Sequence, residues 1–143
     1  MLPTEPLALH HSWPLEDRSM RFDLGRIDDL PPLPPGMPGR WRCEFPGDRL
    51  IWSDGVYDLF GLPRGARVAR DEVVRLYAEG SRAAMERLRA HALKHRRGFT
   101  LDVELRPANG GARWMRLIAA PHYHDGAIVA IEGLKLDVSA LYR

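Results

Sequence analysis

The histidines of this chain are its first candidates for metal or acid–base chemistry, because two pairs of them have spacings that bring side chains together. His91 and His95 are one turn apart in a segment with helical periodicity, and His122 and His124 are two apart in a predicted strand, beside Asp125. A zinc site requires four protein ligands, or three and a water. No further cysteine or carboxylate cluster accompanies the second pair, so we predict a polar hairpin end there.

Nothing in the sequence has the spacing of a nucleophile elbow, a phosphate-binding loop or a metalloprotease helix. Asp102 and Glu104 share one face of a predicted strand and resemble a pair of catalytic carboxylates. That face is opposite the apolar residues of the strand, where we expect the carboxylates to be solvated or paired with Arg113 or Arg116. We therefore expect that the protein is not an enzyme.

Length and composition indicate one globular domain. The 143 residues allow a single core, and 45% hydrophobic with 28% charged residues is an ordinary globular balance. The one cysteine, Cys43, cannot form an internal disulfide, and there is neither a secretion signal nor a run of about 20 apolar residues. We expect a cytoplasmic protein without membrane association. The formal net charge of +2 gives no reason to expect a nucleic-acid partner.

A run of prolines from Pro31 to Pro38 divides the chain, because proline fixes the backbone and removes amide donors. We predict an N-terminal extension and linker at residues 1–37 and a domain at residues 38–140. The extension carries large apolar side chains that we expect to dock on another surface. They belong to Trp13, Leu15, Met20, Phe22 and Leu24.

The domain begins with strand patterns. Trp41, Cys43 and Phe45 alternate with polar residues, which is typical of a half-buried strand. After a turn, residues 50–52 complete a predicted hairpin.

Two short helices are predicted next. Ser53 or Asp54 is expected to cap the first, which Gly61 ends, and Asp71 is expected to cap the second, which Gly80 ends.

A longer helix and three strands fill the rest of the domain. The helix is predicted over residues 81–97, where apolar residues form a narrow stripe. Apolar and polar residues alternate over residues 99–106, and glycine-containing turns connect that strand to strands at 113–120 and 127–138. Two strands, then helices, then three strands pack most simply as an α+β domain with a five-stranded antiparallel sheet and helices on one face.

Four short motifs in the predicted domain have a common resemblance. They are Leu50-Ile51-Trp52-Ser53-Asp54, Leu59-Phe60-Gly61-Leu62-Pro63, Leu105-Arg106-Pro107 with Gly110-Gly111-Ala112-Arg113-Trp114-Met115, and Ile131-Glu132-Gly133-Leu134 with Leu136-Asp137-Val138-Ser139. In this order they resemble PAS domains, in particular the subclass with a WSD…LFGL opening and a DG..RW hairpin. The similarity covers about residues 39–140. One departure is Ala78–Ser81, where the family usually has an acidic turn.

The resemblance implies a sheet curved around a helical cap that encloses a small pocket, and a role in sensing rather than catalysis. Haem-binding PAS domains take an axial histidine from the long helix, which makes His91, ahead of His95, the haem candidate. We favour a solvated basic face there, because arginines and Lys94 surround both histidines. A flavin adduct requires a cysteine on the helix beside the pocket, whereas Cys43 is in the first strand, so we expect no such adduct.

We predict a signal-transduction module that binds a small apolar or aromatic ligand between the sheet and the helical cap. The expected ligand-binding residues are Cys43, Trp52, Phe60, Met85, Leu88, Val103, Met115 and Leu117. The same side chains would equally suit a closed core. The alternative is therefore a ligand-free interaction or dimerisation module that acts through the outer face of the sheet.

We also predict a homodimer, or a complex with a signalling partner, that uses this outer face. Strand alternation places Trp114 and Ile118 on the face opposite Met115 and Leu117. The expected interface residues are Trp13, Leu15, Phe22, Leu24, Trp114 and Ile118. Whether the extension covers its own sheet or that of a second copy stays open.

Overall fold

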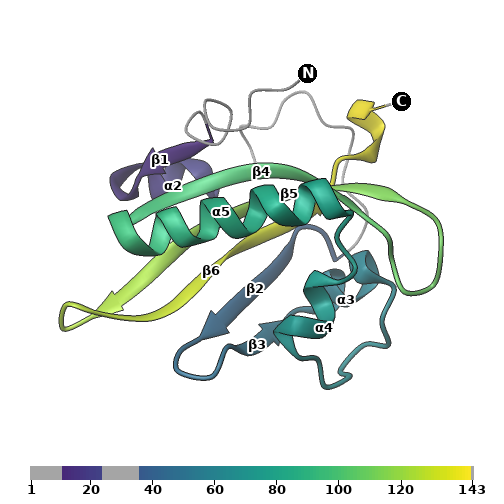
Figure 1. The fold of residues 1–143 in the computed structure, drawn as a ribbon, viewed down its shortest axis with the longest axis horizontal. Helices are drawn as coiled ribbons and strands as arrows, with labels where there is room; N and C mark the ends of the chain where they lie inside the picture. The colour runs from purple at the N-terminus through teal and green to yellow at the C-terminus, as the bar shows by residue number, and fades with distance from the viewer. Residues whose placement is uncertain (1–10, 24–35, 143) are drawn as a thin grey trace.

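The computed structural model describes residues 11–23 and 36–142, and its centre is a six-stranded antiparallel sheet (Figure 1). The strands are β1 (Ser12–Pro14), β2 (Gly39–Glu44), β3 (Arg49–Trp52), β4 (Arg97–Leu105), β5 (Arg113–His124) and β6 (Ala127–Asp137), in the spatial order β1-β4-β5-β6-β2-β3. The predicted α+β class with an antiparallel sheet is confirmed, although the sheet has one more strand than expected. Leu24 and most of the proline run lie outside the described residues.

The helices lie on both sides of this sheet, with the larger ones on one face. Helices α3 (Asp54–Phe60), α4 (Arg70–Val74) and α5 (Glu79–His95) cover the face that we call inner (Figure 1). The short helix α2 (Arg18–Arg21) and a C-terminal 3₁₀ helix (Ser139–Tyr142) border the outer face. None of the helices in the described ranges combines the length and the apolar composition needed to cross a membrane.

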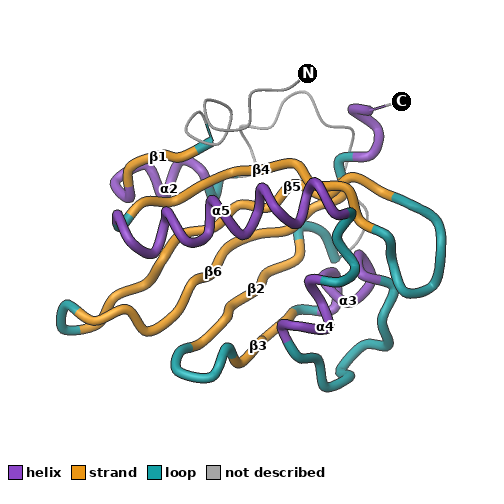
Figure 2. The backbone as a smooth tube through the Cα atoms, in the orientation of Figure 1, coloured by secondary structure: helices purple, strands orange, loops and turns teal. Residues whose placement is uncertain are grey.

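The hairpin and helix α3 form where the sequence predicts them. In the hairpin, Trp41 pairs with Trp52 and Cys43 with Leu50, so these side chains point to the inner face. Helix α3 ends at Gly61, which adopts the left-handed conformation with φ of 68° that glycine tolerates best. The segment that follows α3 runs alongside β3 before α4 begins (Figure 2).

Ser53 is the N-cap residue of α3, as predicted, but it does not form the expected cap hydrogen bond, and the cap assignment for Asp71 is wrong. The hydroxyl oxygen of Ser53 accepts a hydrogen bond from the Arg40 amide at 2.8 Å and makes no cap bond to α3. Asp71 is inside the first turn of α4, which starts one residue earlier.

Helix α4 also ends at Val74 instead of near Gly80. Four residues further on, Ala78 donates its amide to the carbonyl of Glu104 in β4 at 2.9 Å. Gly80 is therefore inside α5, which begins at Glu79.

The two central strands are buried on both faces, which divides the core into two apolar clusters. The inner cluster includes Met115 and Leu117 from β5, under the helices. The outer cluster includes Ile118 from β5 and Leu134 and Leu136 from β6. Because strand residues alternate between faces, neighbouring positions on β5 and β6 serve different clusters.

The sixth strand comes from the N-terminal segment, residues 11–23. Trp13 is 2% exposed and donates its indole N–H to the Thr100 hydroxyl at 3.0 Å. Its ring covers Gly98, where an added Cβ would lie 2.2 Å from Trp13 Cη2. A strand of three residues is too short to show a period-2 pattern, so the sequence did not reveal this one.

We expect Gly98→Ala to displace Trp13 and release β1 from β4, because ring and methyl group cannot occupy the same space. The expected signs are a lower melting temperature and a shifted Trp13 indole resonance. Gly80→Ala is the matched control: a Cβ there meets nothing within 4 Å, so the change should leave the Trp13 signal unshifted. An unshifted Trp13 signal in Gly98→Ala would contradict this packing.

Candidate functional site

A small internal space lies between the inner face of the sheet and the helices α4 and α5. Its volume is about 50 Å³, and its lining includes Trp41 and Cys43 from β2, Trp52 from β3, Met85 from α5 and Lys135 from β6. Each of these residues is on a regular element, so the backbone holds the lining in place. We call this volume the inner space.

The structure brings half of the expected ligand-binding residues to the inner space. Cys43, Trp52, Met85 and Leu117 line it. The others are within the core and at most 2% exposed; they are Phe60, Leu88, Val103 and Met115.

Lys135 is a buried charged residue at this site that the sequence analysis missed, and Arg70 and Arg89 are two further lining cations that it did not predict. It is 5% exposed, and its Nζ lies 4.8 Å from the ring centre of Phe60, 5.0 Å from that of Trp41 and 5.6 Å from that of Trp52. No carboxylate is among the described residues that line the inner space. The ammonium form is thus held by aromatic faces, which attract cations more weakly than an acidic partner does.

Burial lowers the pKa of Lys135 to about 7 from an ordinary value of 10.5. Desolvation is the main cause, and the positive charge of Arg70 lowers the pKa further. A lysine with such a pKa exchanges a proton near neutral pH. The charge of the inner space therefore changes in the physiological range.

Some of the other polar groups around the inner space have hydrogen-bond or ion-pair partners, and others do not. Cys43 Sγ is 3.6 Å from Asp48 Oδ1, and Arg89 contacts the same carboxylate at 3.2 Å. Burial raises the pKa of the Cys43 thiol, which keeps it protonated and a poor nucleophile. Among residues 11–23 and 36–142, none accepts a hydrogen bond from the buried indole nitrogen of Trp52.

One signal in the sequence could have identified Lys135. The chain has 21 lysines and arginines, of which only Lys94 and Lys135 are lysine. An ammonium can lose its proton when it is buried, whereas a guanidinium stays charged. A rare lysine between Leu134 and Leu136 in a predicted strand is therefore a candidate for a buried amine.

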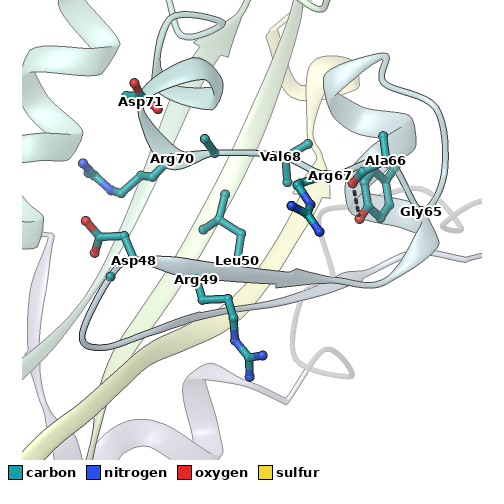
Figure 3. Close-up of a pocket in the computed structure, with 12 residues that line it drawn as sticks. Asp48, Arg49, Leu50, Gly65, Ala66, Arg67, Val68, Arg70 and Asp71 are labelled. Atoms are coloured by element: carbon teal, nitrogen blue, oxygen red, sulfur yellow. Dashed lines mark hydrogen bonds between the residues drawn. The ribbon is translucent and has the colours of Figure 1, made fainter.

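A larger open groove borders the inner space (Figure 3). It lies between the β2–β3 hairpin and residues 65–71, with a volume of about 860 Å³. Its lining carries charges of both signs, including Asp48, Arg49 and Arg67. Leu50 and Arg70 line both the groove and the inner space, so these two side chains separate them.

The histidine pairs are not at the inner space. The rings of His91 and His95 on α5 have centres 4.5 Å apart and planes tilted by 41°, and burial lowers the pKa of His91. His122 Nδ1 is 4.0 Å from Glu132, and His124 Nε2 is 3.4 Å from its neighbour Asp125. Within residues 11–23 and 36–142, no group of three or more histidine, cysteine or acidic residues is arranged to hold a metal.

The carboxylate of Asp102 is occupied by structural contacts. Arg116 donates to both of its oxygens, at 2.8 and 3.1 Å, and the Tyr142 hydroxyl donates to Oδ2. Burial, with the hydrogen bond to Asp102, raises the pKa of Tyr142 to about 12. This agrees with the sequence-based expectation of a paired carboxylate.

On the outer face, the N-terminal segment packs against its own sheet. Trp13 and Ile118 are buried in the outer cluster, and Leu15, Phe22 and Trp114 pack against it. Leu24 lies outside the described residues.

Ion pairs hold this segment in place as well. Arg18 pairs with Glu132 of β6, and that carboxylate also binds Arg42 of β2.

The pKa of Lys135 predicts how stability depends on pH. In the unfolded chain the amine keeps its proton up to about 10.5, whereas in the folded protein it loses it near 7. Between these values the unfolded state binds more protons. The free energy of unfolding should therefore rise with pH above about 7, by at most about 1.4 kcal/mol per unit from this group.

Lys135→Met should remove this rise, and Lys94→Met, at an exposed position, should keep it. Urea unfolding at a series of pH values, from neutrality to about pH 10, where tyrosines begin to ionise, measures the free energy of unfolding of both variants. The difference from wild type isolates the lysine, because Cys43 and the tyrosines titrate in all three proteins. Equal pH slopes in wild type and Lys135→Met would contradict a neutralised amine.

Comparisons with known proteins identify the fold. No family model matches the sequence, and no curated protein matches it. The structure is similar to the N-terminal domain of a diguanylate cyclase with PAS/PAC sensor from Marinobacter aquaeolei, with a TM-score of 0.68 and 14% identity over 74% of this chain and 99% of that one. It is also similar to the PAS domain of a protein from Colwellia psychrerythraea, with a TM-score of 0.61 and 17% identity over 88% and 98% of the two chains.

A third similar structure is an RNA-binding light-oxygen-voltage receptor, with a TM-score of 0.63 and 17% identity. The match covers 74% of this chain and only 30% of that receptor. The four sequence motifs, the order of the elements and these structural matches agree. The chain has the fold of a PAS domain.

Proposed function

We propose that the protein is a signal-sensing module that binds a small ligand in the inner space and transmits the change through its sheet. The fold supports this, because two of the similar structures are named as sensors or receptors. The observation that carries the proposal is a space in the inner cluster that is lined both by the buried Lys135 and by Trp52, whose indole N–H has no partner among the described residues. Buried polar groups without partners are unfavourable, and a ligand would satisfy them.

The size of the inner space limits the ligand. A space of about 50 Å³ is smaller than the roughly 150 Å³ cavity that holds a benzene ring. An aromatic ligand, as expected from the sequence, would require Met85 or Leu50 to move. Methionine side chains repack readily, so Met85 could move to admit a ligand whose binding free energy exceeds the cost of that movement.

Neither haem nor a flavin adduct fits the residues that are present. His91 does not line the inner space, and Cys43 is on strand β2 instead of on a helix. We therefore propose a regulatory role without catalysis and without either of these cofactors. A cytoplasmic location agrees with Cys43 being a free, buried thiol.

The second candidate function is protein interaction through the outer face. The outer cluster is apolar and continuous, and the N-terminal segment that covers it is joined to the domain by the proline-containing residues 24–38. The contacts that this segment makes within one chain would be equally available in a second copy. We propose that the protein forms a homodimer by this exchange, with a signalling protein as the alternative partner.

Native mass spectrometry and an absorption spectrum of freshly purified protein test ligand binding. We expect a bound mass in addition to that of the chain. Met85→Trp should abolish it, because overpacking a core costs about 1–3 kcal/mol and fills the inner space. Ala83→Trp, at an exposed position of the same helix, should retain it. A bound mass that persists in Met85→Trp would place the ligand elsewhere.

Light scattering on the full chain tests the dimer. We expect a dimer that dissociates in Trp13→Ala, because that indole is the most buried group of the N-terminal segment. Met20→Ala is the control, since Met20 is in the same segment and 44% exposed. A wild-type chain that is monomeric at every concentration rules out the dimer.

A further inference from the structure

The polar groups that line the inner space are donors and cations. Lys135, Arg70 and Arg89 bring three basic groups, and Trp52 brings an indole N–H. Arg70 and Arg89 have acidic partners, in Glu86 and Asp48. Within the described part of the chain, Lys135 has no hydrogen bond or ion pair and lies against aromatic rings.

We propose that the inner space binds a small organic carboxylate, whose oxygens pair with the ammonium of Lys135 and accept the indole N–H of Trp52. This inference rests on the proposed ligand-sensing function and names the chemical class of the ligand. A carboxylate is an acceptor only, which matches a lining of donors. A water molecule must also donate hydrogen bonds, and it leaves the ammonium charge uncompensated.

The volume selects among carboxylates. About 50 Å³ exceeds the roughly 30 Å³ that one water takes in the liquid, and it leaves room for a group of a few heavy atoms. Acetate is of this size. The indole of Trp41, which lines the space, would contact its methyl group, and the carboxylate would lie at the amine.

The ionisable groups that face Lys135 decide how binding depends on pH. They are Cys43 from β2, Arg70 from α4, Tyr77 from the α4–α5 connection and Arg89 from α5; the lining residues of β3, β4 and β5 are not ionisable. Cys43 and Tyr77 stay protonated at neutral pH, because burial raises both of their pKa values. The two arginines stay charged, so Lys135 is the group that changes charge.

A bound carboxylate favours the protonated lysine. Affinity should therefore be highest below the pKa of about 7 and should fall by up to about tenfold per pH unit above it. The module would respond both to the anion and to the proton that binds with it.

The groove in Figure 3 provides the route into the site. Leu50 and Arg70 are at the boundary between the groove and the inner space, and the side chain of Arg70 is 20% exposed. An incoming anion would meet Arg70 before it reaches Lys135. The groove would then attract acids ahead of neutral molecules of the same shape.

The test is an NMR titration of the full chain with acetate, in which the Trp52 indole resonance is followed and assigned by Trp52→Phe. Chloride at equal ionic strength and acetamide, a neutral molecule of the same shape, are the comparison solutes. We expect a saturable shift with acetate alone. Lys135→Met should weaken acetate binding at least about tenfold, and Lys94→Met should change it by no more than about twofold.

Two outcomes overturn the proposal in different ways. Equal binding of acetamide and acetate, unaffected by Lys135→Met, would refute an anion site and leave the ligand-sensing function standing. No saturable shift with any solute, and no bound mass in the purified protein, would refute both. If Lys135→Met does not fold, the pH profile of the wild type decides: an acetate affinity that is constant above about pH 7 contradicts the role of Lys135.

Discussion

The side chain of Lys135 is largely withdrawn from water, because strand β6 is covered on both faces and the residue is only 5% exposed. Alternation places Leu134 and Leu136 in the outer cluster and Lys135 on the inner face, where three aromatic rings surround its amine. A charged ammonium in such a place is costly unless an acid accompanies it, and among the described lining residues there is none. The amine is therefore either neutral or paired with a ligand. The inner space, which Lys135 lines, is where such a ligand would bind.

The burial of β6 on both faces also connects the inner space to the outer cluster. Strand β6 contributes Lys135 to the inner space and Leu134 to the surface under the N-terminal segment. The indole of Trp41, which contacts the amine, also donates its N–H to the carbonyl of Leu134 at 3.3 Å. Lys135 on the inner face is thus the direct sequence neighbour of Leu134 on the outer face. Sensing on one face and interaction on the other are compatible functions of one sheet.

Local patterns predicted the elements but not the neighbours of each strand. Alternation over residues 99–106 and the turns after it indicated the meander, and the apolar stripe of α5 correctly placed Met85 and Leu88 in the core. Strand β1 was missed because it is three residues long and pairs with β4 about 85 positions away, as in Ser12 with Phe99. Lys135 was missed because its burial depends on β6 being central, which no local pattern reveals. Half of the residues that we expected to line a pocket are instead buried in the closed core. Sequence alternation predicts which face of the sheet a side chain is on, but it does not predict where the packing leaves a cavity.

The most direct measurement is the pKa of Lys135 itself, from the ¹³Cε and ¹⁵Nζ chemical shifts of labelled protein followed against pH. The other lysine, Lys94, is exposed and serves as an internal reference in the same sample. A midpoint for Lys135 near 7, displaced upward when acetate is added, is the predicted result. A midpoint near the ordinary 10.5, unaffected by acetate, would show that the amine stays charged and solvated and that the inner space is not an anion site.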